Sequence, residues 1–560
     1  MPGRKLLPLC GAMMGWDVLP DLAVRRYVLG TPVSSRLQRR ACHEGHSPEG
    51  PVAARPSSLL LYPAITPVTE APMRPRPIST TLAAALAGLS VLLAAPAGAQ
   101  QMATALPTAL PSGPAAPLSP DDYQRLARQL LEELVAINTT ASSGNETEAA
   151  EAMKRHLLAA GFPEEDLFVG GPDARQGNLV ARLRGRNPAL KPILLLSHID
   201  VVEADPADWT LPPFELIERD GVFYGRGTAD DKDESAIHVA NLIRMKREGF
   251  VPERDIVVAL TADEEGGGSN GVRWLLENHR ELIDAEYALN EGGGGLLDES
   301  GKRISNAVQA SEKKFGNLTV EAVNPGGHSS RPRPDNAIYD LARGLVGISQ
   351  YHFPVRLNEV TRAHLEAQAP LEAPELGAAM RALLVNERDQ AAADVLSKDI
   401  RYNSILRTTC VATLLDGGHA SNALPQRATA TVNCRMLPDE DPQNVQRALQ
   451  QAAGSGVTVT LAGDPRNSPP SPLTAEIMEA IEKVTSELWS GVPVVPTMAT
   501  GATDGLYLRI LGIPTYGVSG LFYGETGSHG MNERVPVQSF YEGQEFLYRL
   551  VKTLTSGPVS

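Results

Sequence analysis

Apolar positions along the chain follow two spacings, one typical of buried strands and one typical of amphipathic helices. Short apolar runs without a period of their own, such as Pro192–Leu196 and Asp255–Thr261, favour buried parallel strands. Between such runs the spacing is helical, as in Asp121–Ile137, Glu146–Ala160 and Glu234–Glu248. Because strands alternate with helices, we expect an α/β fold with a mostly parallel sheet that helices cover on both faces.

The pattern changes near Ser311. A strand with alternating polarity (Gly316–Val323), a helix (Asn336–Ile348) and a long Ala/Glu-rich helical stretch (351–400) come first. They are followed by elements expected at Thr408–Leu415, Arg427–Met436, Pro442–Ala453 and Val457–Leu461. This order predicts an α/β sandwich at residues 312–465, inserted as a lid domain into an outer domain made of residues 118–311 and 466–556.

The first 117 residues have a different composition. Residues 1–72 are rich in Arg, Pro and Gly and have no sustained period, so we interpret them as a non-native or disordered extension. Residues 73–99 resemble a signal peptide, because two arginines precede the apolar run Leu82–Ala95 and Ala97-Gly-Ala99 offers a cleavage site. An uncleaved anchor is the alternative, although the run is shorter than the ~20 residues of a spanning helix. Residues 100–117 read as a linker, and we expect an exported, periplasmic or secreted protein without a membrane association after cleavage.

Composition narrows the possible functions. A hydrophobic content of 42% and a charged content of 21% are ordinary for a globular protein, and the net charge of −15 argues against a nucleic-acid partner. Cys410 and Cys434 follow the expected cleavage site and flank the two expected lid strands. An oxidising compartment would allow a disulfide between them, but two buried free thiols fit the sequence equally well.

Acidic and histidine side chains gather where the expected strands of the outer domain end. Each alone is compatible with a structural role, but together they belong to one edge of one sheet, where open α/β sheets bind ligands. They are His198 with Asp200, the pair Asp230-Asp231, the carboxylates of Thr261–Gly267 (Asp263, Glu264 and Glu265), Glu291, and His529 in a loop near the C-terminus. Several carboxylates in one place would repel each other, and a pair of divalent cations would remove that conflict. The mixture of imidazole and carboxylate ligands suits two Zn²⁺ ions, with Co²⁺ or Mn²⁺ as alternatives.

Eight motifs then define a specific resemblance. SHIDVV, GRGTADDK, TADEEGG, ALNEGG, NPGGHSS, SNALP, NCRMLP and SHGMNERV follow one another between about Leu118 and Leu554. In this order they resemble the M20 family of co-catalytic zinc metallopeptidases and acylases, which includes carboxypeptidases, dipeptidases and aminoacylases. The resemblance implies a zinc-hydrolase domain with an inserted lid that often mediates dimerisation. One departure is Asp233, where the family usually has Gly.

The resemblance also assigns roles. The implied metal ligands are His198, Asp230, Glu265, Glu291 and His529, with Asp230 as the bridge and a cis peptide after it. The implied catalytic residues are Asp200, which orients His198, Glu264 as general base, and His328, which stabilises an oxyanion, often in the partner's active site. The implied substrate contacts are Asn422, Arg435 and Gly501, the last two with a free carboxylate. Pairing of Arg435 with Asp439 or Glu440 is the structural alternative.

These expectations define a metal-dependent hydrolase. It would cleave an amide bond next to a free carboxylate, in a peptide, a dipeptide or an N-acyl amino acid, with a metal-activated water and Glu264 as the base. It would act as a homodimer joined through the lid. The alternative is a non-catalytic metal- or ligand-binding protein of the same architecture, which would have no need of Glu264. A serine hydrolase is disfavoured because no G-x-S-x-G motif occurs.

Overall fold

A computed structural model describes residues 119–266, 268–463 and 465–557. The expected extension, signal peptide and linker therefore lie outside the described residues. Within the described part, no helix combines the length and the apolar character that crossing a membrane requires.

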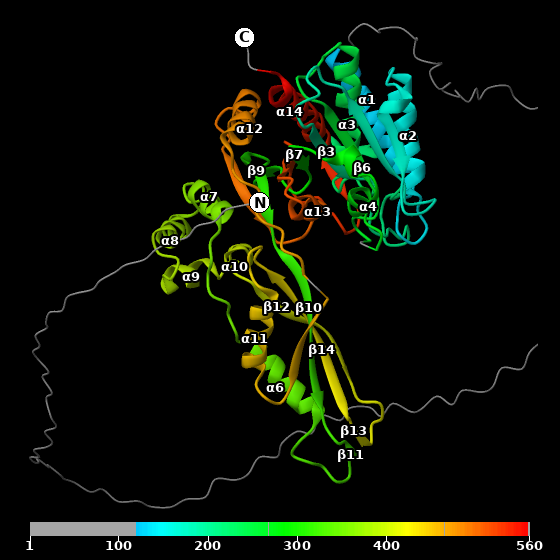
Figure 1. Cartoon of the computed structure of the whole chain (residues 1–560). Coiled ribbons are helices and arrows are strands. Elements are labelled where there is room, and N and C mark those ends of the chain that lie inside the picture. Colours follow the sequence, from blue (N-terminus) through cyan, green and yellow to red (C-terminus); the bar gives the residue numbers. More distant parts are fainter. Residues whose placement is uncertain (1–118, 267, 464, 558–560) are drawn as a thin grey trace, which may run out of the picture. The chain divides into compact units, whose positions relative to one another are not determined.

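A mixed, mostly parallel sheet forms the centre of the outer domain (Figure 1). Along it the strands run β1-β2-β6-β3-β7-β17-β9-β8-β18, and β16 pairs with β9. Their bounds are β1 Leu167–Gly170, β2 Asn178–Leu183, β3 Ile193–His198, β6 Ile256–Thr261, β7 Tyr287–Asn290, β8 Gly295–Leu297, β9 Arg303–Glu312, β16 Val494–Ala499, β17 Thr515–Gly517 and β18 Phe522–Tyr523. Strand β3 is parallel to both β6 and β7, and β17 is parallel to β7. The expected α/β class is confirmed.

Helices cover both faces of this sheet. Because successive side chains of a strand point to opposite faces, Leu195 of β3 joins one core and Leu194 and Leu196 join the other. The first core is closed by α1 Pro120–Ala136, α2 Glu146–Ala159, α3 Lys232–Arg247, α12 Ala475–Leu488 and α14 Val537–Thr555. The second is closed by α4 Gly271–Asn278, α5 Arg280–Ile283 and α13 Gly505–Ile510. The short 3₁₀ helix Glu164–Asp166 precedes β1.

Local sequence sets the ends of these helices. Ser119 and Asp122 form a reciprocal capping box at the start of α1, and the Asn145 side chain caps α2. Helix α3 ends before Gly249, whose φ of +66° is the left-handed conformation that glycine adopts at little cost after a helix.

A small antiparallel sheet joins distant parts of the outer domain. It consists of β4 Ile217–Arg219, β5 Val222–Tyr224 and β19 Arg534–Pro536, in the order β19-β5-β4. Tyr224 of β5 is opposite Arg534 of β19. The loop that follows β5 therefore lies beside the loop that precedes β19, although some 300 residues separate them in the sequence.

The segment expected to form the lid, for which that name is kept below, contains a second, antiparallel sheet in the order β12-β14-β10-β15. Its strands are β10 Lys314–Val323, β12 Thr409–Gly417, β14 Arg427–Met436 and β15 Thr458–Ala462, and α6 Ala337–Ser349 and α11 Pro442–Ala453 pack on one face. Cys410 and Cys434 are cross-strand neighbours joined by a disulfide, which decides between the two expectations for them. Beyond β10, the two-residue strands β11 Gly327–His328 and β13 Ala423–Leu424 pair with each other.

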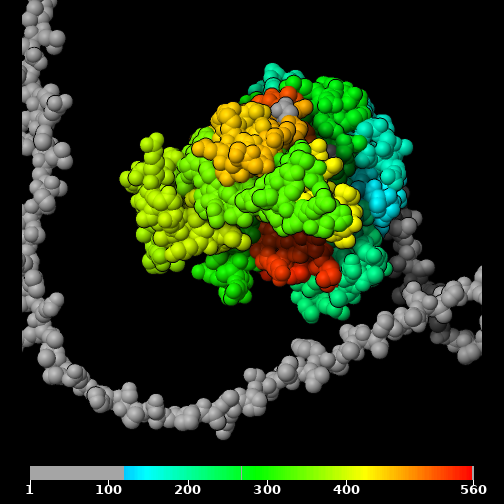
Figure 2. All heavy atoms as spheres, turned by 90° about the horizontal axis from the view of Figure 1, so that it is seen from below, coloured from blue at the N-terminus to red at the C-terminus, as the bar shows by residue number. Residues whose placement is uncertain are grey.

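The helical stretch between α6 and β12 has a hydrophobic core of its own. It consists of α7 Glu359–Gln368, α8 Pro374–Val385, α9 Gln390–Leu396 and α10 Ile400–Leu406, which gather around Leu365, Met380 and Leu396 (Figure 2, yellow-green). Helix α7 also packs against β16 of the main sheet, and His364 Nδ1 donates a hydrogen bond to the Pro496 carbonyl at 2.9 Å. This helical segment therefore contacts the outer domain directly, through α7.

Candidate metal centre

Three neighbouring parallel strands end at one edge of the main sheet and deliver most of the expected ligands. His198 is the last residue of β3 and is opposite Thr261, the last residue of β6. Glu264 and Glu265 follow β6, and Glu291 follows β7. The convergence follows from strand order, because β6, β3 and β7 are adjacent in the sheet.

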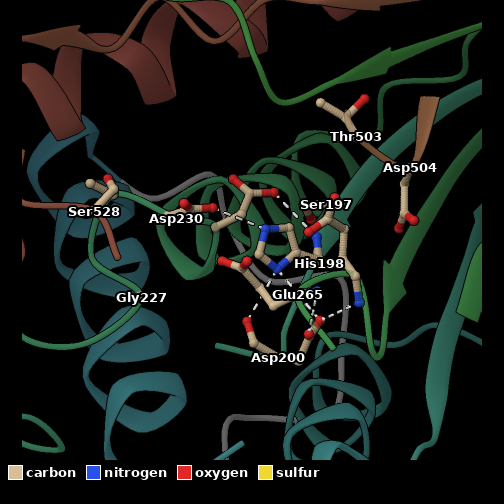
Figure 3. Close-up of polar contacts among 12 residues, drawn as sticks. Ser197, His198, Asp200, Gly227, Asp230, Glu265, Thr503, Asp504 and Ser528 are labelled. Carbon is tan, nitrogen blue, oxygen red and sulfur yellow. Dashed lines mark hydrogen bonds and ion pairs between the residues drawn. The ribbon is translucent and has the colours of Figure 1, made fainter. Parts of the chain in front are cut away.

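The remaining two ligand candidates come from the loops that β5 and β19 bring together. The Asp230 carboxylate lies between two imidazoles. Its Oδ1 is 3.1 Å from His198 Nε2 (Figure 3). Its Oδ2 is 3.2 Å from His529 Nε2. His529 Nε2 is also 2.9 Å from Glu265 Oε1. The peptide between Asp230 and Asp231 is cis, as the resemblance implied.

These side chains form two groups that could each hold a cation. His198, Asp230 and Glu291 make one group, and Asp230, Glu265 and His529 make the other, with ligand atoms within 4.8 Å of one another in each. Ligands at about 2.0–2.2 Å from one Zn²⁺ lie roughly 3–4 Å apart, so both groups fit an ion after small side-chain adjustments. Asp230 belongs to both groups, which is the geometry of a bridging ligand. Glu264 forms a third group with His198 and Glu265.

The charges in the cluster are strongly unbalanced without cations. Partial burial and the nearby Glu291, Asp504 and Glu265 raise the pKa of Glu264 to about 10. Burial, Asp230 and Glu234 likewise raise the pKa of Glu291 well above its usual value. Burial opposes ionisation of Asp230, but hydrogen bonds from both histidines hold its pKa below the ordinary range. Divalent cations would offset the mutual repulsion of these carboxylates.

Asp200 acts on the cluster through both its backbone and its side chain. Its carboxylate accepts the backbone N–H groups of Glu264 at 3.1 Å and Glu265 at 2.9 Å. The Nδ1 of His198 lies 3.1 Å from the Asp200 carbonyl and 3.5 Å from its carboxylate. In the metal-free site Nε2–H donates to Asp230. When a cation is bound, donation from Nδ1 to Asp200 would leave the Nε2 lone pair for the ion, which is the tautomer a metal ligand needs.

Glu533 was not singled out by the sequence reasoning, yet it joins the two ligand-bearing loops. Its carboxylate accepts the N–H groups of Gly227 at 3.0 Å and Ala229 at 2.8 Å, and forms a 2.7 Å ion pair with Arg226. The side chains of Arg226 and Glu533 are only 2% and 0% exposed. Glu533 belongs to the SHGMNERV motif, but the sequence does not distinguish a buried glutamate from a surface one.

The loop that carries Gly501 is held in place by hydrogen bonds of two buried side chains, Thr503 and Asp504. Asp504 Oδ2 accepts a hydrogen bond from Thr261 at 2.9 Å, and Thr503 donates to Glu312 at 3.0 Å. Gly501 itself is exposed, with no atom within 4 Å of the position that a Cβ would take. The loop therefore presents an open backbone next to the end of β6.

Arg435 lies on the lid face opposite the disulfide-containing core. Its guanidinium is 5.3 Å from the ring of Phe315, its partner in the sheet register. Asp439 and Glu440 pair with Arg356 instead, so the structural alternative for Arg435 is wrong. Within the described residues Arg435 forms no ion pair.

His328 and Asn422 lie together, but away from the metal ligands. The Ser329 N–H donates to the Asn422 carbonyl at 2.9 Å, and both residues are exposed. They follow the far end of β10, which at about 3.3 Å per residue lies roughly 30 Å from the end that joins β9. In a single chain the structure does not bring these two residues to the metal centre.

A cavity of about 500 Å³ adjoins the acidic cluster. Asp230 and Glu291 lie at its edge, and its walls come from β8, β9, β16, α7, α10 and the loop before His529. Its apolar wall residues are Leu296, Ala307, Tyr402, Ile405, Val495 and Met498. Asp233, at the position where glycine was expected, binds the hydroxyl of the wall residue Tyr523 at 3.0 Å.

Fold and site together define a metal-dependent hydrolase of the α/β class. A family model described as peptidase family M20/M25/M40 matches residues 194–553, and the chain belongs to this family. The expected family is thereby confirmed, and with it the assignment as a peptidase or amidohydrolase.

Characterised relatives and solved structures agree with this placement. The chain is 27% identical over 384 residues to human N-fatty-acyl-amino acid synthase/hydrolase PM20D1, covering 66% of this chain and 75% of the relative. It is 29% identical over 382 residues to rat aminoacylase-1A, covering 67% and 82%. The M20 metallo-carboxypeptidase Sso-CP2 of Sulfolobus solfataricus superposes with a TM-score of 0.59 at 20% identity, covering 77% of this chain and 99% of that one.

Proposed function

We propose that the protein hydrolyses an amide bond next to a free carboxylate, with two divalent cations, most simply Zn²⁺, held on either side of Asp230. The observation that carries this proposal is the Asp230 carboxylate, whose two oxygens face His198 and His529 at 3.1 and 3.2 Å. Nitrogen and oxygen donors in this mixture suit Zn²⁺, and Co²⁺ and Mn²⁺ are alternatives. When bound, the ions would supply Lewis-acid activation of water and of the scissile carbonyl.

Glu264 is the proposed general base. It lies one residue from the ligand candidate Glu265, and its backbone is fixed by Asp200. A carboxylate at this place takes the proton of the attacking water and returns it to the leaving amine. Asp200 positions His198 and the Glu264–Glu265 loop at the same time, so it contributes as a positioning residue.

The free carboxylate of the substrate is proposed to meet Arg435 and the backbone at Gly501. Arg435 has no acidic partner among the described ion pairs, and its planar guanidinium suits a carboxylate. Substrates with such a group include peptides with a free C-terminus and N-acyl amino acids. The names of the relatives, a fatty-acyl amino acid hydrolase and an aminoacylase, fit the second class.

His328 and Asn422 are proposed to act on the active site of a partner subunit. Their position beyond the far end of β10 supports this arrangement, because roughly 30 Å separate them from the base of the lid. Strand β12 is an edge strand and exposes Val411, Leu414 and Leu415 by 62%, 68% and 72%. An exposed apolar edge strand is a ready site for pairing with a second copy.

Complementation tests this arrangement directly. The variants His328→Ala and Glu264→Ala should each be inactive, and a mixture that exchanges subunits should recover up to about a quarter of the wild-type activity. A mixture that stays inactive while mixed dimers form would show that His328 does not act on the partner's site. If the protein sediments as a monomer in ultracentrifugation, the dimer is no longer part of the proposal.

Export is also proposed, because residues 73–99 resemble a signal peptide. Fractionation of cells that express the full chain would test it.

The function itself is tested by metal removal and by Glu264→Ala. Chelation should abolish amidase activity and Zn²⁺ should restore it. Glu264→Ala should keep its metal while turnover falls by several orders of magnitude, since base catalysis and water activation are both lost. Glu299→Ala, an exposed glutamate, is the matched control and should behave as wild type. Metal binding without hydrolysis of any N-acyl amino acid or peptide would instead favour a binding protein.

A substrate panel tests recognition of the carboxylate. Each N-acyl amino acid or dipeptide is assayed together with its amide- or ester-blocked form. Blocking should reduce kcat/KM sharply for the wild type and much less for Arg435→Met. If blocked and free substrates react equally well with the wild type, Arg435 and Gly501 do not recognise a carboxylate.

A further inference from the structure

Lys313 connects the main sheet to the lid. It lies between the end of β9 and the start of β10 (Figure 1). Its backbone N–H donates to the carbonyl of Ala499 at 3.0 Å, at the end of the strand that leads into the Gly501 loop. Its side-chain Nζ donates to Thr409 Oγ1 of the lid at 3.2 Å. Lys313 therefore contacts both the base of the Gly501 loop and the lid.

The Lys313 side chain lies on the same face of the lid sheet as Arg435. Thr409, its hydrogen-bond partner, is opposite Arg435 in the register of β12 and β14, and directly opposite residues share a face of a sheet. Arg435 is also opposite Phe315, which follows Lys313 by two positions and so points the same way. Lys313 is thus close to both groups that are proposed to meet the substrate carboxylate, Arg435 and the backbone at Gly501.

Two basic side chains meet here without an acidic partner. Within the described residues neither Lys313 nor Arg435 forms an ion pair, although Lys313 is only 1% exposed. Burial and the nearby Arg435 lower the pKa of Lys313 to about 7. The preceding acid, Glu312, is paired with Arg509 at 3.0 Å. An unpaired ammonium group in this position destabilises the fold, and a methionine would fill the same space without this penalty.

The adjacent Lys314 has a structural role that Lys313 lacks. Its side chain points to the other face, where it donates to the Glu440 carbonyl and to Asn467. Burial lowers the pKa of Lys314, but nearby carboxylates, Asp439 among them, offset part of this effect. Lys314 thus has acidic neighbours within the fold, whereas the charge of Lys313 is left for a ligand.

We propose that Lys313 supplies a second positive charge to the carboxylate site and thereby favours substrates with a free carboxylate over uncharged ones. The inference rests on the proposed function and deepens it, because it adds a residue to the recognition by Arg435 and Gly501. A bound carboxylate offsets the repulsion between Lys313 and Arg435, so it also favours the charged form of the lysine. Lys313 is therefore a specificity-determining residue and takes no part in the chemical step.

Selectivity for the free carboxylate tests this role. The ratio of kcat/KM for an N-acyl amino acid to kcat/KM for its N-methylamide isolates the carboxylate, because Glu264 and the metal-activated water act on both substrates. Lys313→Met should lower this ratio by about tenfold or more, mainly through KM, and Lys313→Arg should retain most of it because the charge remains. Lys314→Met is the matched control, since it removes a neighbouring buried lysine and should leave the ratio unchanged.

The pH dependence of the ratio is a readout that a merely structural role would not move. Because the pKa of Lys313 is about 7 without a ligand, binding of a carboxylate above pH 7 requires proton uptake. The wild-type ratio should fall by about tenfold or more between about pH 7 and 9, and stay flat in Lys313→Met and Lys313→Arg. Arg435 keeps its charge over this range, and Glu312 is paired with its arginine. Burial raises the pKa of Asp504, the acid of the Gly501 loop, to about 6, so it is ionised throughout.

The outcomes separate this inference from the function on which it rests. A ratio in Lys313→Met equal to that of the wild type, equal losses in Lys313→Met and Lys314→Met, or a wild-type ratio independent of pH would overturn the role of Lys313 and leave the hydrolase intact. Should Lys313→Met fail to fold, the pH profiles of the wild type and Lys313→Arg decide alone. Absence of metal-dependent hydrolysis for every substrate would instead contradict the proposed function.

Discussion

Glu533→Gln tests whether one buried carboxylate holds the two ligand-bearing loops together. The substitution keeps the shape of the side chain but removes its charge. Glu533 forms an ion pair with Arg226 at 2.7 Å and accepts two backbone N–H groups, from Gly227 and Ala229. The amide keeps one acceptor and turns its NH₂ group toward a second donor, so Arg226 or a backbone N–H loses its partner.

The size of the effect follows from burial. Both partners are almost fully enclosed, and removing one member of a buried ion pair costs about 3–5 kcal/mol. Arg226 keeps a 2.8 Å hydrogen bond to the Gly530 carbonyl and a contact with the Trp209 ring at 4.9 Å. We therefore expect the lower end, about 3 kcal/mol off the free energy of unfolding of the metal-free protein.

Metal affinity should fall as well. Ala229 precedes Asp230 in the chain, and His529 lies in the same loop as Glu533, so loosening this contact moves ligand candidates of both cation groups. Changes to residues that orient metal ligands typically cost about 10–100-fold in affinity. Urea unfolding of the metal-free protein and competition with a chromogenic chelator measure the two effects separately.

Glu525→Gln is the control in the same loop. Its ion pair with Arg534 is 3.3 Å long, and the Glu525 side chain is 91% exposed. Such a surface pair contributes about 0–1 kcal/mol, and its loss should leave metal affinity unchanged. If the two variants unfold at the same urea concentration and bind Zn²⁺ equally well, Glu533 does not couple the loops and the reasoning from burial is refuted.

Three further predictions follow, two on stability and one on substrate binding. Burial lowers the pKa of His238 to about 4, so the stability that the neutral side chain permits is fully present above about pH 6.5. About 3 kcal/mol of the free energy of unfolding is lost as the pH falls toward 4. His238→Leu should reduce this loss in urea unfolding at pH 7 and 4.5, and an equal loss in the variant and the wild type would contradict the prediction. Cys410 and Cys434 are 24 positions apart, so replacing both with Ser should destabilise the lid by about 3–4 kcal/mol by calorimetry, with no change expected if the reduced lid is already constrained. Asp504→Asn should raise KM more than it lowers metal affinity, because Asp504 fixes the Gly501 loop through Thr261; a purely metal-dependent defect would contradict that role.

The strand ends that carry the ligand candidates could be predicted because their pattern is local. An apolar run followed by an acid or a histidine is visible without knowledge of the neighbours, and strand order then brings the ends together. Strand β9 could not be predicted in this way. Its residues Asn306 and Gln309 are polar and buried, which breaks the apolar pattern. Asn306 donates to Thr485 at 3.0 Å, so the burial depends on a partner in α12 that the sequence does not reveal.

The same limit applies to β16 and to the residues around the site. Pro496 stands inside β16, and a proline within an apolar run argues against a strand. The structure accommodates it because β16 pairs with β9 alone and His364 binds the carbonyl of Pro496. Because the sequence pattern did not predict β16, it did not predict the cavity either, since one wall of the cavity is this strand. Glu533 was missed for a related reason, because its partners are backbone N–H groups without a sequence pattern.

The contacts of Asp200, Glu533 and Asp504 share one physical principle. Each is a buried or nearly buried carboxylate that accepts hydrogen bonds from loops at the edge of the main sheet, and none belongs to the two cation groups. These bonds hold Asp230, Glu265 and their neighbours close together in spite of like-charge repulsion. The loops are thus organised before a cation arrives, and the binding energy is not spent on folding them. The metal-free protein should therefore keep its fold, and cations should add stability that grows with the logarithm of their concentration once it exceeds Kd.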